Sequence, residues 1–559
     1  MVSMSWACES AMNERVRPPA CRRRPTMSQR HTLPRSVAGL RGLIVAVGLA
    51  STALLAGSSA SYYDEALPST MNPLFARTMV DRRSQELVFD RLWYRSAITN
   101  TLQSRIVDRW ERLEDGRKIK LVLNEGIKWH DGKSLGPEDI CFTVEAMLDG
   151  NTPSEIAKEY RESLVGCEKN NRENSVIIEF VKAYHNPRER IAFHVLPKHA
   201  FDSTSISPDL DFSARPIGTG PMRGSKGRRE VKFTAFPNAH TNPQIQELSM
   251  SEGGDPFVQA RTLLNAGVHG VISVPPPLRP DIAASDDVAL KSYDLRSWWF
   301  MALNTSTPAL ADRRVRQAIH HTLDRSTLRE LTIGVDPNDT NPPCEFVSGP
   351  FVQSSPYYNR SIKVQERSDK ARSRQLMTEA GATMQAGRWI MNGQPITLRI
   401  GMNAPLNAEA RDLLNQMGNQ LQEGGFDRQV YMVPPDDWVH KAVTGRLRDQ
   451  YDALIGKWSF GVVEEVNPMF HTRTRDGKGS LNLFNYSNAE VDALLARYEA
   501  ARTDTEAQDA YHDLHALLAE ELPYIFLWKL DTKSAWRNEV RNNTITPYFY
   551  FTQFDEWRL

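Results

Sequence analysis

Motifs that identify common enzyme classes are absent from this sequence. It contains no Gly-Xaa-Ser-Xaa-Gly, no His-Glu-Xaa-Xaa-His and no Cys-Xaa-Xaa-Cys, which would indicate a serine hydrolase, a zinc protease and a redox or metal site. Its carboxylates are scattered, so no acid/base pair can be nominated. The sequence gives no positive reason to predict an enzyme, and we expect no catalytic residue, metal site or cofactor.

The chain also lacks an excess of charge of either sign. Lys plus Arg and Asp plus Glu both number 68, for a formal net charge of +0. This balance supplies no bulk attraction to nucleic acid, and we expect no nucleic-acid partner. A chain of 559 residues with 40% hydrophobic residues can form several domains with ample cores.

Complete nucleotide-binding loops are missing as well. Gly132-Lys133-Ser134 resembles the end of a phosphate loop, but five residues separate Gly126 from Gly132, whereas the motif needs four. The glycines of Gly218-Thr219-Gly220 could open a dinucleotide loop, but Arg223 stands where its third glycine belongs. A tight backbone crossing between lobes is the better interpretation of Gly218 and Gly220.

No apolar run reaches the roughly twenty residues that a membrane helix needs. The longest, Leu43–Gly57, has fifteen; a basic region precedes it and the small residues 58–60 follow it. This pattern is typical of a secretory signal peptide, with Met27 as the start; an uncleaved anchor is the alternative. No cysteine stands at the cleavage site, so we expect a periplasmic protein without lipid attachment.

Cysteines are few, five in all, and Cys8 and Cys21 precede the export signal. The other three permit one disulfide with one free thiol, or three reduced thiols. Cys141 lies beside the apolar face of a predicted helix, so we interpret it as a buried small hydrophobe. A Cys167–Cys344 bridge is then the possible pairing.

The stretch from Leu121 to Asp149 organises the chain. It reads LVLNEGIKWHDGKSLGPEDICFTVEAMLD, which predicts a strand, a tight turn at the Asp-Gly pair and a helix that starts near Pro137. On that helix, the apolar residues fall on one face; they are Ile140, Val144, Met147 and Leu148.

Further elements follow from local pattern. Gln85–Arg95 predicts a helix, and Ser487 with Glu490 predicts a capping box. A parallel β-α-β unit is expected from 396–402, 413–421 and 429–433. Another predicted helix carries His512 and His515 three positions apart; a solvated face is a more common role for such a pair than a metal site.

The stretch also resembles a known signature. The order Gly126-Ile127-Lys128-Trp129-His130-Asp131-Gly132, followed by Glu138-Asp139-Ile140 and Phe142, is similar to that of the extracellular solute-binding proteins of oligopeptide, dipeptide and nickel transporters, family 5. Three further segments match that family: Pro216–Pro221 (PIGTGP), Asp312–Ile319 (DRRVRQAI) and Asn485–Leu494 (NYSNAEVDAL).

The resemblance implies an α/β fold of the type II periplasmic binding protein kind, with two α/β lobes, a hinge and an inserted third domain. Residues 1–60 would be a non-structural terminus and signal peptide. Lobe I would use residues 61–95, 213–296 and 529–559; the inserted domain II would be 96–212, and lobe II would be 297–528.

The resemblance also implies a ligand cleft between the lobes. Peptide binders of the family place Asp three residues after a cleft Trp, where it pairs with the peptide amino terminus. Here Trp458 is followed at that position by Gly461, so either a nearby glutamate replaces the Asp or the ligand has no free amine. The expected ligand-binding residues are Glu65, Leu67, Trp298, Trp299, Trp458, Ser459, Phe460, Gly461, Glu464 and Glu465. The alternative for each of the aromatic ones is a place in the core.

The implied function is the substrate-binding component of an ABC transporter for peptides or peptide-like solutes, acting as a monomer with a membrane permease as partner. A binder of non-peptide solutes that serves as a sensor or chaperone is the alternative, motivated by Gly461 and by Gly270, where the family has acidic residues. An exported hydrolase is a remote third hypothesis.

Overall fold

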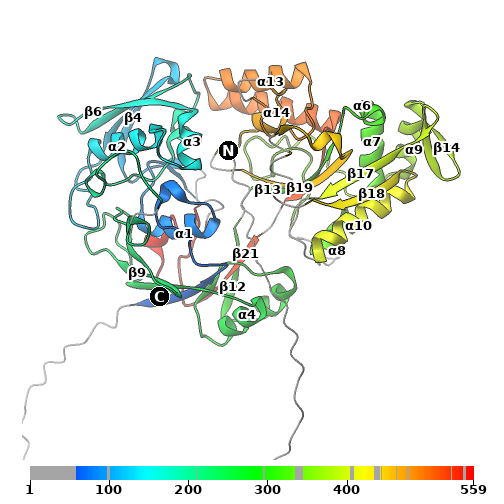
Figure 1. Cartoon of the computed structure of the whole chain (residues 1–559). Helices are drawn as coiled ribbons and strands as arrows, with labels where there is room; N and C mark the ends of the chain where they lie inside the picture. Colours follow the sequence, from blue (N-terminus) through cyan, green and yellow to red (C-terminus); the bar gives the residue numbers. More distant parts are fainter. Residues whose placement is uncertain are drawn as a thin grey trace, which may run out of the picture. The chain divides into compact units, whose positions relative to one another are not determined.

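The computed structural model describes residues 58–559 except 97–100, 209–210, 294–295, 334–343, 403–407, 434–440, 442–443, 461–462, 475–477, 530–531 and 546–548 (Figure 1). The predicted start at Met27 and the apolar run of the signal peptide lie outside the described residues. Helices and strands are mixed along the chain, and the strands form several sheets. The expected α/β class is confirmed. No described helix is both long and apolar enough to cross a membrane.

A seven-stranded sheet is built from both ends of the described chain. Its first strand, β1, pairs in parallel with β10 and β11, and the other pairings are antiparallel. β1 begins at Ser59, two residues before the predicted start of the folded chain, since Ser59 and Ala60 already pair with β10. The order is β12 (Val288–Tyr293), β21 (Thr532–Arg537), β11 (Gly270–Val271), β1 (Ser59–Asp64), β10 (Glu247–Glu252), β9 (Glu230–Ala235) and β8 (Met222–Lys226).

A five-stranded sheet forms the second α/β unit. Strand β17 pairs in parallel with β18, and α10 (Ala408–Glu423) connects them, which confirms the predicted parallel β-α-β unit. Strand β13 is antiparallel to both neighbours. The order is β18 (Asp427–Met432), β17 (Thr397–Met402), β19 (Ala453–Ser459), β13 (Ser297–Leu303) and β20 (Tyr524–Lys529).

The chain passes between these two sheets twice. Strand β12 of the first sheet is followed directly by β13 of the second, with residues 294–296 between them. Strand β20 of the second sheet is likewise followed by β21 of the first, with residues 530–531 between them. Short double connections of this kind are where hinges between lobes are found.

A four-stranded sheet carries the organising stretch. Its order is β4 (Val107–Leu113), β5 (Lys118–Leu123), β7 (Ser175–Phe180) and β6 (Leu164–Asn170). Helix α2 (Pro137–Leu148) packs against β6 and β7, and Ile140, Val144 and Met147 are fully buried, as the periodicity predicts. These side chains share one apolar cluster with the seven-stranded sheet, so the two sheets depend on a common core.

The remaining helices and small sheets lie between these strands in the sequence. The other helices are α3 (Glu155–Arg161), α4 (Pro256–Leu264), α5 (Arg279–Ala283), α6 (Pro308–Ala311), α7 (Arg313–Thr322), α8 (Arg325–Ile333), α9 (Lys370–Glu379), α12 (Asn467–Phe470), α13 (Ala489–Ala500) and α14 (Asp504–Glu521). The other strands are β2 (Tyr94–Arg95), β3 (Leu102–Gln103), β14 (Thr383–Gln385), β15 (Arg388–Met391) and β16 (Gln394–Pro395).

The helix predicted over Gln85–Arg95 is displaced toward the amino terminus. Helix α1 spans Met79–Val88 and begins with a capping box, in which the Thr78 side chain accepts from the Asp81 N–H at 3.1 Å and the Asp81 carboxylate accepts from the Thr78 N–H at 2.9 Å. It ends at Val88 because the chain turns extended there, and the Val88 carbonyl accepts from the Gly220 N–H at 2.9 Å. The apolar residues of 89–93 are buried although they lie outside the helix.

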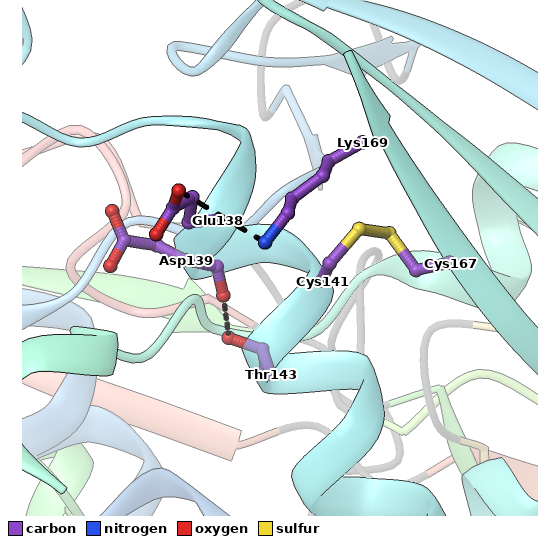
Figure 2. Close-up of a disulfide and its surroundings, with 6 residues drawn as sticks. All are labelled: Glu138, Asp139, Cys141, Thr143, Cys167 and Lys169. Carbon is purple, nitrogen blue, oxygen red and sulfur yellow. Dashed lines mark hydrogen bonds and ion pairs between the residues drawn. A yellow bond between two sulfur atoms is a disulfide. The ribbon is translucent and has the colours of Figure 1, made fainter. Parts of the chain in front are cut away.

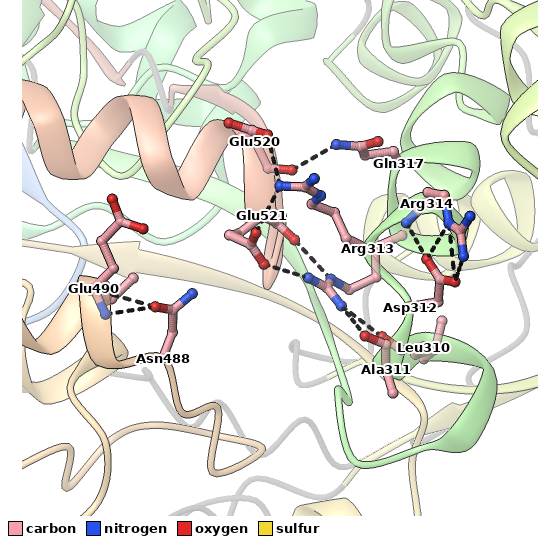
Figure 3. A network of polar contacts seen from close by, with 12 residues as sticks. Leu310, Ala311, Asp312, Arg313, Arg314, Gln317, Asn488, Glu490, Glu520 and Glu521 are labelled. Carbon is pink, nitrogen blue, oxygen red and sulfur yellow. Dashed lines mark hydrogen bonds and ion pairs between the residues drawn. The ribbon is translucent and has the colours of Figure 1, made fainter. Parts of the chain in front are cut away.

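Two of the matched segments stabilise helix ends near one another (Figure 3). Asn488, and not Ser487 as predicted, caps α13 by accepting from the Glu490 and Val491 N–H groups. Arg313 forms an ion pair with Glu520 at 2.7 Å. The buried Arg316 donates to the Glu521 carbonyl at 2.8 Å, at the negative end of the α14 dipole.

A disulfide joins Cys141 of α2 to Cys167 of β6 (Figure 2). Their Cα atoms are 5.1 Å apart, and Cys344 is buried and takes no part in this disulfide. The interpretation of Cys141 as an unbonded hydrophobe and the Cys167–Cys344 pairing are therefore wrong. The sequence could not reveal the pairing, because it depends on α2 lying across β6.

Removing the disulfide should destabilise the protein. The cross-link spans a sequence separation of 26, and the chain-entropy model gives a loss of about 3.5 kcal/mol for such a loop. We expect this loss in Cys141→Ala/Cys167→Ala, measured by urea unfolding. The control, Cys344→Ala, removes one buried thiol and should lose clearly less; equal losses in the two proteins would contradict the prediction.

Candidate functional site

The carboxyl end of β1 carries two acidic residues with different environments. Asp64 is buried and accepts from Arg83 of α1 at 2.5 and 3.0 Å. Glu65 is half-exposed and lies 3.7 Å from the same guanidinium. The bidentate hydrogen bonds give Asp64 a structural role, whereas the Glu65 carboxylate remains accessible to a ligand. Leu67, also predicted to bind ligand, is half-buried and packs against the core.

The predicted aromatic residues lie on opposite faces of the five-stranded sheet. Trp298 of β13 lies directly opposite Trp458 of β19, and both belong to one apolar cluster with Phe460. Trp299 lies opposite Lys457 and packs against the cluster on the other face. Because side chains alternate along a strand, Trp298 and Trp299 cannot line one wall together.

The stretch after Trp458 begins with a polar contact. The hydroxyl groups of Ser459 and Ser297 are 2.7 Å apart, on the sheet face that also carries Trp299 and Lys457. Gly461, which stands at the family's anchor position, lies outside the described residues. The two glutamates that could replace the anchor are both described.

Glu464 is buried in a local ion pair. Its Oε1 lies 2.9 Å from Arg296 Nη1, and its Oε2 accepts from the Ser355 hydroxyl. The side chains of Glu464 and Arg296 are 2% and 6% exposed, so each desolvated charge depends on the other. Arg296 belongs to the first crossing between the sheets, and the ion pair therefore joins that crossing to the loop after β19.

Glu465 forms a second ion pair, which reaches the segment after β7. Its Oε2 lies 2.8 Å from Arg190 Nη1, and the Arg190 guanidinium lies 4.6 Å from the Tyr184 ring centroid. Burial would raise the pKa of Glu465, but the charge and hydrogen bond of Arg190 lower it below its usual range. Both candidate replacements for the anchor thus have cationic partners within the chain.

Three cationic residues of this region were missed by the sequence predictions. Arg190 and Arg296 are distant in sequence from Glu464 and Glu465, so no local pattern links them. Lys457 stands directly before Trp458 on β19, opposite Trp299 of β13. Burial lowers the pKa of Lys457, and the Glu65 carboxylate opposes this effect.

The two most recognisable motifs meet at His130. Its Nδ1 accepts from the Gly218 N–H at 3.2 Å, and its Nε2 lies 3.0 Å from the Gly220 carbonyl. A Cβ at Gly218 would lie 1.8 Å from the Val88 carbonyl oxygen, so only glycine permits this approach. The interpretation of these glycines as a tight backbone passage agrees with this geometry.

A cavity among the described residues lies away from these side chains. It has a volume of about 670 Å³ and surrounds the start of α2. Among its polar groups, Lys198 lies 3.2 Å from Glu138, and His199 lies 2.8 Å from Asp131. No ligand role follows from these satisfied pairs.

The histidine pair of α14 does not form the predicted solvated face. His515 is fully buried; its Nδ1 accepts from the Asn359 N–H at 3.0 Å, and its Nε2 lies 3.0 Å from the Ser348 hydroxyl. Helix α14 packs its His515 side against the chain around 348–359. Across the described part of the chain, no three His, Cys, Asp or Glu side chains are grouped as a metal site.

Two α/β units, whose sheets are joined by two short crossings of the chain, define a periplasmic binding protein fold. The family model described as "Bacterial extracellular solute-binding proteins, family 5 Middle" matches residues 101–480. The chain belongs to this family, as the sequence resemblance predicted.

Similar proteins agree with this assignment. The oligopeptide-binding protein AppA of Bacillus subtilis is 21% identical, over 88% of this chain and 90% of AppA. A probable di/tripeptide-binding protein of Pseudomonas aeruginosa is 22% identical, over 83% of this chain and 89% of its own length.

Solved structures share the fold. AppA from Bacillus subtilis in complex with a nonapeptide has a TM-score of 0.69 at 20% identity, over 90% of this chain and 99% of AppA. NikA from Brucella suis in complex with Fe(III)-EDTA has a TM-score of 0.74 at 20% identity, over 89% of this chain and 99% of NikA.

Acidification should weaken the fold through His130. Burial lowers its pKa to about 4, against 6.5 in an unfolded chain. The folded state therefore excludes a proton that the unfolded state binds below pH 6.5, and up to about 3 kcal/mol of stability is lost as pH falls from 6.5 to 4. In His130→Asn, urea unfolding should show a flatter pH dependence over this range; equal slopes would contradict the prediction.

Substitution of Glu464 should reveal a structural role. Glu464→Gln leaves the buried Arg296 charge without its carboxylate, and we expect a loss of about 3 kcal/mol in unfolding free energy. The double variant Arg296→Met/Glu464→Leu should recover at least half of it. Glu65→Gln, at a half-exposed site, is the control and should change stability little. Unchanged stability in Glu464→Gln would instead favour an anchor for ligand.

Proposed function

We propose that this protein is the substrate-binding component of an ABC transporter for peptides or peptide-like solutes. The observation that carries the proposal is the family 5 match over residues 101–480, on a fold of two sheets joined by two crossings. Relatives named as oligopeptide- and di/tripeptide-binding proteins support the ligand class. The protein acts by capture and delivery to a membrane permease, and it is not an enzyme.

The mechanism is closure about the two crossings. Lobe I comprises residues 61–95, 213–296 and 529–559, the inserted domain 96–212, and lobe II 297–528. Ligand binds the closed state best and so shifts the population toward it. Two ion pairs link the inserted domain to lobe II, Arg190 with Glu465 at 2.8 Å and Lys182 with Glu499 at 3.1 Å; both would stabilise a closed state.

The protein works as a monomer in the periplasm, to which its signal peptide exports it. The Cys141–Cys167 disulfide supports this location, since disulfides form and persist in oxidising compartments. No cysteine is available at the predicted cleavage site for lipid attachment.

A second candidate function is capture of a non-peptide solute, as a sensor or a chaperone-like binder. The observation that favours it is the pairing of Glu464 with Arg296 and of Glu465 with Arg190. Because both glutamates already bind arginines, neither takes the place of the family's aspartate as an anchor for a ligand amine. Gly270 no longer supports it: a Cβ there would lie 2.5 Å from the Trp536 ring, so its identity has a packing reason.

Native mass spectrometry of the protein, purified from its host without refolding, tests the proposal. We expect a ladder of short peptide masses that disappears after unfolding and refolding, and a decrease in the radius of gyration when these peptides are added back. A single non-peptide mass would support the second candidate. No bound mass, and no compaction with pooled di- and tripeptides, would contradict uptake of peptides.

A further inference from the structure

A small cavity in lobe II is lined by cationic and polar side chains. It has a volume of about 60 Å³ and lies between the last turn of α7, the start of α8, the end of α14 and strand β20. None of the described residues that line it is Asp or Glu. A cavity of this size has room for a small ion or a few water molecules. Its polar lining comes from His320, Arg325, Ser348, Lys363 and Gln365.

Arg325 is the buried charge at this cavity. Only 1% of the residue is exposed, and its Nη1 donates to the carbonyls of Val347 and Phe526 at 3.2 and 2.6 Å. The guanidinium carbon lies 5.6 Å from the Phe346 ring centroid. Its Nε is buried without a hydrogen-bond partner, and Arg325 forms no ion pair within the described part of the chain. A desolvated cation without a counter-charge is costly, so the cavity favours an anion.

Asp324 and Glu366 do not supply the missing counter-charge. The Asp324 carboxylate accepts from the Thr327 N–H at 2.9 Å and lies 3.7 Å from the exposed Arg367. Glu366 is exposed and acts on Arg325 electrostatically without forming an ion pair with it. Burial outweighs this effect and lowers the pKa of Arg325 to about 10, so the guanidinium stays charged at neutral pH.

Two more residues beside Arg325 favour an anion. In the last turn of α7, Nδ1 of His320 is buried without a hydrogen-bond partner. Burial and the charge of Arg325 lower the pKa of the His320 ring well below its usual range, and a neutral imidazole still donates one hydrogen bond. Arg329, on the next turn of α8, is buried as well and donates to the Cys344 carbonyl at 3.3 Å, which adds charge of the same sign.

We propose that this cavity binds one small inorganic anion with the size and single charge of chloride. The anion accepts hydrogen bonds from Arg325 Nε and His320 Nδ1, and the exposed Lys363 adds attraction. By neutralising the buried guanidinium it holds α7, α8 and α14 together and stabilises lobe II. None of the expected ligand-binding residues lines the cavity, so this inference does not rest on the proposed function.

Urea unfolding in chloride and in gluconate tests the proposal in solution. Sodium chloride replaces sodium gluconate at constant ionic strength and pH, and gluconate is too large for the cavity. An anion that binds only the folded state stabilises it with the logarithm of its concentration. We therefore expect the folding equilibrium constant of the parent to rise about tenfold for each tenfold increase in chloride above the dissociation constant.

Three variants assign this response to the cavity. Arg325→Met removes the buried charge and should abolish the chloride response. Ala519→Leu fills the cavity from α14 and keeps Arg325; it should also abolish the response, and it decides the matter if Arg325→Met fails to fold. Arg367→Met, at an exposed arginine that does not line the cavity, is the control and should respond as the parent does.

Anomalous diffraction from crystals grown in sodium bromide locates the ion. We expect a bromide peak within hydrogen-bond distance of Arg325 Nε in the parent and none there in Ala519→Leu. Bromide on the surface alone would mean an adventitious ion only and would overturn the proposal. A peak in the cavity without a chloride response in solution would mean binding at crystal concentration only, with the same consequence. An equal chloride response in the parent and in Ala519→Leu would overturn it too.

Discussion

The close approach of residues 218–220 to Val88 is the constraint on which the placement of the signature stretch, residues 121–149, depends. The Val88 carbonyl accepts from the Gly220 N–H and leaves no space for a Cβ at Gly218. This contact ends α1, and His130 binds the other side of the same glycine backbone. The turn that precedes the signature helix is thus held to residues 218–220 by hydrogen bonds of the His130 ring to the glycine backbone, which need a buried and uncharged imidazole.

The sequence predicted local elements well where apolar periodicity and turn chemistry agreed. The strand, turn and helix of 121–149 and the parallel unit of 397–432 formed as expected, because burial pattern and backbone preference coincide there. Prediction failed where distant partners decided the outcome. The Val88–Gly220 bond stopped a helix that the pattern of 85–95 favoured, and the α2–β6 packing paired Cys141 with Cys167, neither of which a local window contains.

Distant partners also limited how far the site could be predicted from the sequence. Residue types around Trp458 could be read from the family motif, but the state of each acidic residue depended on cations from other segments. Arg190 and Arg296 approach Glu465 and Glu464 only through the fold. The two-residue period of a strand also separates adjacent tryptophans, so a run such as Trp298-Trp299 supplies one residue to each face.

The pairing of acids with arginines changes what a ligand meets in this protein. Separating a buried carboxylate from its guanidinium partner costs free energy. Glu464 would therefore bind a ligand amine only if its ion pair with Arg296 were broken. The half-exposed Glu65 would bind a ligand amine at a smaller cost, because Asp64 already pairs with the nearby Arg83. Ligand recognition is therefore expected to involve Glu65 more than the glutamates after Trp458, although these stand nearer to the family's anchor position in sequence.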